Sequence, residues 1–351
     1  MIMRRRRAAS AADEQPAPDL PWGRPMLGNG LHLPVTPAMV PEILEQARCL
    51  DLPDNEGVFR VDWAGVRTRI PMLPWAPARY AGTTSTRVPV PSDGYRSEAE
   101  EYVSLILSLT SSTDTYRVVE AGAGWAPWAV MGIVCAKRLG KQAHGIAVEA
   151  DATRAGWAMR HAEDNNLTAE LLTGSPAELA AALASASTAD LRVVQAAVWT
   201  ESTTLRFPTL DAQDMGGAVN TEVDPNMDYR GANLPHVDVP TVTLAGLLAG
   251  PAPTDLLHVD VQGMECEVLL PERELIAQRV RFMTVGTHDR HVEGRLQDAF
   301  LREEWALLLE SPCRAVFDGV KPTLTGFTTQ DGNQVWANSR FRDANPLILR
   351  T

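Results

Sequence analysis

From about residue 97 onward, short apolar segments alternate with amphipathic ones, and this alternation constrains the fold more than any other feature of the sequence. The apolar segments have the length and β-branched content of strands, and the segments between them repeat apolar residues at helical spacing. Strands that alternate with helices in this way form a doubly wound, mostly parallel sheet. We expect strands at Arg117–Ala121, Ala143–Val148, Leu191–Trp199, Asp255–Val261 and Val280–Thr287, and helices at Ser97–Leu109, Pro127–Leu139, Ala152–Asn165 and Glu265–Leu270.

Three further segments complete this prediction. Near the end of the chain, Gly326–Thr329 and Gln334–Ala337 flank Gln330-Asp331-Gly332-Asn333, a turn sequence typical of a hairpin that supplies the antiparallel strand closing such a sheet. The segment Thr168–Asp190, rich in Ala and Ser, is interpreted as an insertion with one helix. The polar segment Asp211–Tyr229 is long for a connection inside a compact domain, so we expect it to build part of a substrate pocket together with the N-terminal region.

The N-terminal region differs in composition from the rest. Residues 1–20 carry four consecutive arginines among small residues and are interpreted as a disordered tail, although the arginines could bind an acidic surface. Residues 21–95 are rich in Pro and Gly, and they predict a cap with a short helix at Pro41–Ala47 and a β-hairpin over Val58–Met72. The remaining residues, 96–351, would form the ligand-binding domain.

Charge and cysteine content exclude several classes of function. The chain has 44 acidic and 32 basic residues, a formal charge of -12, which would repel nucleic acid. Its four cysteines form no CxxC pair or zinc-type cluster and favour a reducing compartment. No apolar run approaches the ~20 residues of a membrane span, and none follows the arginines as a signal peptide would require. We expect a soluble, cytoplasmic protein.

The most informative segment is a glycine loop between the first core strand and its helix. Arg117–Ala121 runs into Gly122-Ala-Gly124, and Pro127 suits the first turn of the following helix. Glu149 ends the next strand, where an acidic residue can accept both hydroxyls of an adenosyl ribose. Ligands of open α/β sheets bind at these carboxyl ends of strands. The loop therefore predicts a nucleoside cofactor.

Two residues distinguish between the candidate cofactors. A dinucleotide-binding loop reads GxGxxG, but Pro127 stands at the third glycine position here. Glu120, which ends the first strand, would repel a pyrophosphate and could attract the ammonium group of a methionyl moiety. These residues favour S-adenosylmethionine over NAD.

Several segments resemble the core of the FkbM-type methyltransferases, and together they extend over about residues 95–340. The usual motif of that family after the fourth core strand is Lys-Ile-Asp-Val-Glu-Gly-x-Glu. Asp260, Gly263 and Glu265 match this motif, whereas His258 replaces the lysine and Gln262 replaces the first of the two glutamates, both on the acceptor side. The other similar segments are Val119–Trp128, Val148–Asp151, His161–Asn166 and Val194–Val198.

This resemblance implies a Rossmann-like class I methyltransferase fold and the use of S-adenosylmethionine, usually to methylate a hydroxyl oxygen. The acceptor would be a small molecule or a glycan, often a sugar or a natural product. The implied cofactor-binding residues are Glu120, Gly122 and Gly124 at the methionyl end, Glu149 at the ribose, Ala197 near the adenine, and Trp125, Ala150 and Asp260 beside them.

An alcohol acceptor must lose a proton, which requires a base or a metal ion. Asp260 ends one strand, and His288 and Asp289 follow the next. We expect His288 to act as the general base and Asp260 to orient the acceptor or the base. A loop-fixing role for His288 and a helix-capping role for Asp260 stay open, and His291 and Glu293 are weaker candidates.

A metal site at the same strand ends is the alternative. Asp260, His288 and Asp289 could hold Mg²⁺. We favour catalysis without a metal ion, because histidine is a softer ligand than Mg²⁺ prefers and neither loop carries a dense acidic cluster.

Other assignments are open at this point. Tyr95 and Glu98–Glu101 could form a lid over the cofactor or an ordinary helix start, and His258 is interpreted as a core histidine. Trp125 and Trp128 could line a pocket or pack the first helix. The alternatives to an O-methyltransferase are a carboxylate or nitrogen methyltransferase, a nicotinamide oxidoreductase, and a non-catalytic module that binds S-adenosylmethionine. The sequence also leaves open whether the chain forms a homo-oligomer.

Overall fold

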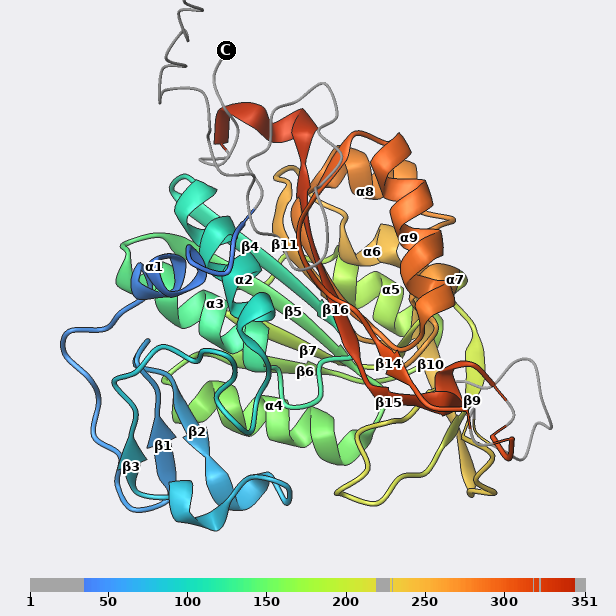
Figure 1. Ribbon diagram of the computed structural model, residues 1–351, viewed down its shortest axis with the longest axis horizontal. Coiled ribbons are helices and arrows are strands. Elements are labelled where there is room, and N and C mark those ends of the chain that lie inside the picture. Colours follow the sequence, from blue (N-terminus) through green and yellow to red (C-terminus); the bar gives the residue numbers. More distant parts are fainter. Residues whose placement is uncertain (1–34, 219–227, 229, 318, 322, 345–351) are drawn as a thin grey trace, which may run out of the picture.

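An eight-stranded sheet forms the centre of the molecule (Figure 1). The computed structural model describes residues 35–218, 228, 230–317, 319–321 and 323–344, so the predicted tail, residues 1–20, lies outside the described residues. In their order across the sheet, the strands are β13 (Trp305–Ser311), β16 (Gly332–Asn338), β12 (Val280–Thr287), β11 (Thr254–Val259), β4 (Thr115–Ala121), β5 (Gln142–Glu149), β7 (Leu191–Gln195) and β6 (Ala169–Leu172).

All neighbouring strands are parallel except those that pair with β16, which runs antiparallel between β12 and β13. The predicted doubly wound, mostly parallel α/β fold with an antiparallel C-terminal strand is confirmed. Helices cover both faces of the sheet (Figure 1). One face carries α2 (Ala99–Ser111), α3 (Pro127–Arg138) and α4 (Ala152–Asp164), and the other carries α5 (Pro176–Ala184), α6 (Leu244–Leu247), α7 (Glu265–Leu269), α8 (Arg273–Arg279) and α9 (Arg290–Arg302).

Each face of the sheet has its own hydrophobic core. Successive side chains of a strand point to opposite faces, so that Val118 of β4 packs in the core under α2 and α3, whereas Val119 packs in the core under α5 to α9. The same alternation directs His258 of β11 towards α2. Polar side chains that the central strands direct to this face therefore contact α2 or α3.

Local sequence explains where the helices begin. Pro127 occupies the first turn of α3, and Asp151 caps α4 by accepting a hydrogen bond from the backbone N–H of Arg154. Ser175 and Glu178 form a capping box at the start of α5. These contacts satisfy backbone N–H groups that have no partner inside the helix.

The predicted C-terminal hairpin is wrong. Thr328–Gln330 forms β15, which pairs with β14 (Arg314–Ala315) in a separate two-stranded sheet. The next strand, β16, instead pairs with β12 and with β13, a strand that the sequence analysis missed. The turn at residues 330–333 therefore passes the chain from one sheet to the other, because the apolar residues of β16 are buried between β12 and β13.

Two further expectations need correction. The predicted strand Leu191–Trp199 is broken at Ala196 into β7 and β8 (Ala197–Val198), because the Ala196 N–H donates to the carbonyl oxygens of Glu149 and Val194. The insertion at residues 168–190 contains the predicted helix, α5, but also the edge strand β6. Beyond the break, β8 belongs to a small sheet with β10 (His236–Val242) and β9 (Thr204–Pro208).

The described part of the N-terminal region packs against α2. It contains α1 (Val40–Glu45), the predicted antiparallel hairpin of β1 (Phe59–Val61) and β2 (Arg67–Arg69), and β3 (Thr83–Thr84). Short 3₁₀ turns lie in this region at Ile70–Met72 and Ala78–Tyr80, and near the end of the chain at Thr325–Phe327 and Ser339–Ala344. The Trp63 ring lies 5.2 Å from that of Tyr102, edge to face, and its indole N–H donates to the Leu44 carbonyl. The division of the chain near residue 96 stays a prediction.

Among the described helices, none has the length and apolar character to cross a membrane.

Candidate active site

A cleft lies at the carboxyl ends of the central strands. It encloses about 750 Å³, counted with the part that is open to solvent, which is within the usual size range of small-molecule sites. The structure brings together along this cleft many of the residues predicted for the cofactor, namely Gly122, Gly124, Glu149, Ala150, Ala197 and Asp260. Their role in cofactor binding stays a prediction, but their convergence follows from the parallel strands that carry them.

The first glycine of the loop has no room for a side chain. Gly122 has a φ of +75°, and a Cβ atom at this position would lie 1.7 Å from the backbone oxygen of Asp260. Gly124 has a φ of +54°, and its N–H donates to Glu149 across the cleft at 2.8 Å. Both conformations favour glycine, and they let the backbone itself line the cleft.

The carboxylate of Glu149 is fixed by two backbone N–H groups. Its Oε2 accepts from Gly124 and its Oε1 from Asp151, each at 2.8 Å. Burial raises its pKa to about 7, against the opposing effect of these hydrogen bonds. The position at the end of β5, beside the glycine loop, is where a ribose-binding acid is expected.

Glu120 stabilises the start of α3, a role that the sequence analysis did not indicate, whereas Trp125 packs against other side chains, as one of its two open interpretations allowed. The Glu120 carboxylate accepts from the backbone N–H groups of Ala129 at 2.7 Å and Trp128 at 3.4 Å, and burial raises its pKa to about 7. The Trp125 ring lies 5.3 Å from that of Trp75 in an aromatic cluster. Neither residue belongs to the described lining of the cleft, and the predicted cofactor contacts of both stay predictions.

Tyr95 and the loop at residues 211–229 also have defined places where the structure describes them. Tyr95 is buried in the same aromatic cluster as Trp125. Met215, Gly217 and Ala218 line the cleft, and Arg154 holds this segment through the backbone oxygen of Asp214. The described part of the loop thus borders the cleft, and residues 219–227 and 229 lie outside the described residues.

A second cavity lies beside the cleft and has a volume of about 530 Å³, also counted with its open part. We refer to it as the acidic cavity, because Glu98, Glu101, Asp260 and Asp331 line it together with His288 and Asn333. Among the described residues, Asp260 lines both the cleft and this cavity. A molecule bound in the cleft and another bound in the acidic cavity would therefore both lie beside Asp260.

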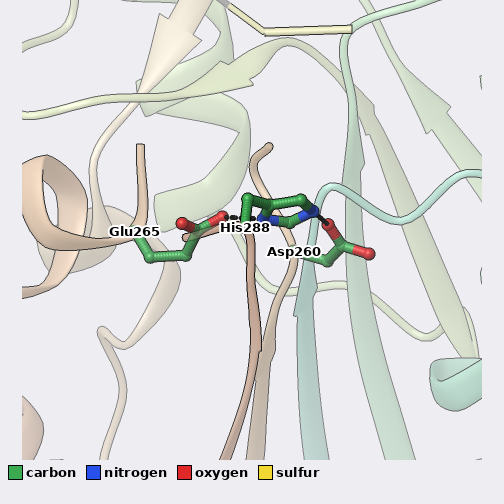
Figure 2. A group of neighbouring side chains, drawn as sticks. All are labelled: Asp260, Glu265 and His288. Atoms are coloured by element: carbon green, nitrogen blue, oxygen red, sulfur yellow. Dashed lines mark hydrogen bonds and ion pairs between the residues drawn. The ribbon is translucent and has the colours of Figure 1, made fainter. Parts of the chain in front are cut away.

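His288 lies between two carboxylates (Figure 2). Its Nδ1 is 2.9 Å from Oε1 of Glu265, and its Nε2 is 3.3 Å from Oδ1 of Asp260. Asp260 follows β11, Glu265 begins α7, and His288 follows β12, so three separate segments assemble the group. The sequence predicted Asp260 and His288 but assigned no role to Glu265.

These contacts determine the charge of the ring. Burial lowers the pKa of His288, but the charges and hydrogen bonds of Glu265 and Asp260 outweigh it and raise the pKa well above its usual value. Burial raises the pKa of Asp260, but the hydrogen bond and charge of His288 outweigh it and the pKa is lowered. Near neutral pH, His288 is therefore an imidazolium that hydrogen-bonds to Glu265 through Nδ1 and forms an ion pair with Asp260 through Nε2.

Asp289 takes no part in this group. Its Oδ1 accepts from the backbone N–H groups of His291 and Val292 at 2.8 Å, and its Oδ2 from the Thr325 hydroxyl, so it caps α9. Among the described residues, the ligand atoms that lie within 4.8 Å of one another and could hold a metal ion belong instead to Asp260, Glu265 and His288. The two carboxylates face opposite ring nitrogens, as Figure 2 shows, so a single ion could replace only one of the two hydrogen bonds.

The two weaker candidates lie elsewhere. His291 is exposed on α9. The Glu293 carboxylate is buried and accepts from the Cys313 N–H at 2.6 Å and from the Thr287 hydroxyl at 3.2 Å. It therefore stabilises the end of β12 on the other face of the sheet.

A second buried histidine contacts the acidic cavity through Glu101. His258 Nε2 lies 3.1 Å from Oε1 of Glu101, which also accepts from the Asn333 amide at 3.2 Å. Burial lowers the pKa of His258, but Glu101 outweighs it and the net pKa is raised. The alternation of side chains along β11 directs His258 and the following Asp260 to one face of the sheet. That Glu101 is the partner of His258 follows only from the packing of α2. The ring of Trp128 lies 5.6 Å from that of His258, which supports the packing reading of this tryptophan.

Comparisons with known proteins point to one class of enzyme. The family model described as "Methyltransferase FkbM domain" matches residues 132–311, just over half of the chain. A protein of Jannaschia sp. (strain CCS1) named "Putative methyltransferase" is 28% identical over 240 residues, which cover 67% of this chain and 78% of that protein.

Two solved structures are also similar. The methyltransferase FkbM from Methylobacillus flagellatus KT is 14% identical, with a TM-score of 0.34 over 63% of this chain and 44% of that one. The MTase domain of METTL16 is 12% identical, with a TM-score of 0.33 over 67% of this chain and 64% of that one. The chain thus spans less than two thirds of the length of either structure.

Proposed function

Because the chain belongs to the family of FkbM methyltransferases, we propose that it transfers a methyl group from S-adenosylmethionine to a hydroxyl oxygen of a small or medium-sized acceptor, such as a sugar or a natural product. The observation that carries this proposal is the position of Asp260, which lines both the cleft and the acidic cavity. Methyl transfer requires the two reactants to lie in line and close together. A cofactor in the cleft and an acceptor in the acidic cavity would satisfy that requirement.

The residues of the cleft fit this cofactor. Gly122 and Gly124 allow the backbone to approach a ligand, and the fixed carboxylate of Glu149 offers an acceptor for ribose hydroxyls. Ala150 and Ala197 are small residues of the same wall. When bound, S-adenosylmethionine supplies an electrophilic methyl group on a sulfonium. The chain itself has to position the acceptor and receive its proton.

The first prediction concerns Glu149. Replacing it with alanine is expected to weaken binding of S-adenosylmethionine by about 10- to 100-fold, because hydrogen bonds to a charged group are each worth roughly 1.5–3 kcal/mol. Calorimetry measures this change, with NAD as the comparison cofactor. Glu163→Ala, an exposed position on the same side of the sheet, is the matched control. Unchanged affinity in Glu149→Ala, or tight binding of NAD alone, would contradict the assignment.

Asp260 and His288 are assigned to the deprotonation of the acceptor hydroxyl. Asp260 Oδ1 accepts from Gln262 at 2.8 Å and from His288, while Oδ2 has no hydrogen-bond partner among the described residues. We assign the orientation of the acceptor hydroxyl to Asp260. His288 receives the proton at Nε2 in the neutral form of its ring, and Glu265 holds the ring through Nδ1.

A second prediction follows for metal dependence. Activity is expected to survive exhaustive chelation, because both nitrogens of His288 already have carboxylate partners and histidine is a poor ligand for Mg²⁺. The measurement is methyl transfer before and after treatment with a chelator, with cofactor affinity as the check on folding. Loss of activity that Mg²⁺ restores would instead assign an ion to the group of Asp260, Glu265 and His288, where it would replace one of the two His288 contacts.

A further inference from the structure

The wall of the acidic cavity offers hydrogen-bond acceptors and negative charge. Its described side chains are carboxylates, hydroxyls, amides and the ring of His288, and they include no lysine, arginine or apolar side chain. The neighbouring cleft differs, because Val148, Phe207 and Leu210 contribute apolar surface there. A ligand of the acidic cavity must therefore be polar, and it must bring hydrogen-bond donors.

The positive charge inside the cavity is already engaged. The two N–H groups of His288 face Glu265 and Asp260, and His258 faces Glu101. Glu98 and Asp331, in contrast, are exposed and form no ion pair among the described residues. These two carboxylates add two negative charges that no described cation pairs with.

Asn333 provides an independent observation. It lines the cavity with only 7% of its surface exposed, and its amide group donates to Glu101. Its side-chain carbonyl oxygen is buried and has no hydrogen-bond partner among the residues that the structure describes. A buried carbonyl without a partner is unfavourable, so the wall of the cavity lacks a hydrogen-bond donor at this position.

We infer that the methyl acceptor carries a protonated amine in addition to the hydroxyl group, and that Glu98 and Asp331 bind this ammonium in the acidic cavity. The inference rests on the proposed function, since it treats this cavity as the acceptor site. An anionic acceptor would meet a net negative charge, because the His288 ring is already paired with two carboxylates, and a neutral one would leave Glu98 and Asp331 without a counter-charge. An amino sugar or an aminocyclitol has the required combination of ammonium and hydroxyl groups.

Binding of matched compounds tests this inference without turnover. Calorimetry in the presence of S-adenosylhomocysteine would compare glucosamine, galactosamine and 2-deoxystreptamine with their N-acetyl derivatives, and the two amino sugars with the corresponding uronates. The best-binding amine is expected to bind at least tenfold more tightly than its neutral derivative, and the difference should shrink as salt is added. Equal or tighter binding of the neutral or anionic compounds, or no binding by any amine, would overturn the inference.

Variants of the two exposed carboxylates locate the effect. The double change Glu98→Gln and Asp331→Asn is expected to reduce the tenfold preference for the amine to less than threefold, while the affinity for the neutral derivative is unchanged. Asp298→Asn removes an exposed charge of α9, paired with Arg302, and serves as the matched control. An unchanged preference in the double variant would overturn the assignment to Glu98 and Asp331.

The two proposals can fail separately. Transfer of a labelled methyl group to the hydroxyl of a neutral acceptor, with no preference for the amine, would leave the proposed function standing and overturn the inference. Tight binding of an amine whose nitrogen, and not its oxygen, receives the methyl group would overturn the O-methyltransferase proposal and leave the ammonium site standing.

Discussion

Replacing His288 with glutamine is expected to lower the rate of methyl transfer by about 10²- to 10⁴-fold, the usual contribution of a general base. Affinity for S-adenosylmethionine should stay near the wild-type value, because His288 lines the acidic cavity and is not part of the described lining of the cofactor cleft. Single-turnover transfer of a labelled methyl group measures the first quantity, and calorimetry the second. Unchanged cofactor affinity also shows that the variant is folded.

The pH profile separates a base from a merely structural histidine. The charged groups around the His288 ring are Asp260, Glu265 and Asp331, and the first two raise its pKa well above the usual value. Because the neutral ring is the active form, the wild-type rate should rise with pH from neutrality up to that raised pKa. Glu265→Gln and Asp260→Asn remove one negative charge each, so in both variants the rising limb should move to lower pH.

The raised pKa of His288 also makes the stability of the fold depend on pH, and stability falls where activity rises. A raised pKa in the folded state stabilises the protein fully below the unfolded value of about 6.5, and this contribution is lost as the pH rises through the folded value. The melting temperature should therefore fall over the pH range in which the activity rises, and His288→Gln should remove that part of the pH dependence. Full activity of His288→Gln would favour a carboxylate or nitrogen acceptor, which needs little base catalysis.

Replacing Gly122 with alanine is expected to destabilise the protein by roughly 2–5 kcal/mol and to abolish cofactor binding. The added Cβ would lie 1.7 Å from the backbone oxygen of Asp260, at a residue whose φ is +75°. That oxygen belongs to the chain leaving β11 in the centre of the sheet, so it cannot move without displacing Asp260 itself. Denaturant unfolding and calorimetry with S-adenosylmethionine measure the two effects.

Gly156 provides the matched control. It lies inside α4, and a Cβ there would meet no atom within 4 Å. Gly156→Ala should therefore stabilise the protein by up to about 1 kcal/mol through helix propensity and leave cofactor affinity unchanged. If Gly122→Ala proved as stable as the wild type and bound the cofactor normally, the close approach of Gly122 to the backbone oxygen of Asp260 would not be required for stability or for cofactor binding.

Local sequence patterns by themselves determined the fold class and several residues of the cleft. The alternation of strand and helix patterns is a short-range property, and β12 lies at the predicted residues, Val280–Thr287. Gly122, Gly124 and Glu149 could be placed at strand ends because parallel strands bring their carboxyl ends to one edge of the sheet. The predicted role of these residues needed no knowledge of which helix packs where.

The partners of the buried polar groups were decided only by the tertiary structure. Glu265 reaches His288 from α7, and Glu101 reaches His258 from α2, across 23 and 157 residues of sequence. The predicted hairpin failed for the same reason, since β16 pairs with β12 and β13 instead of its sequence neighbour. Such contacts depend on which faces the two hydrophobic cores bring together, and a pattern read along one segment carries no information about the segment that will cover it.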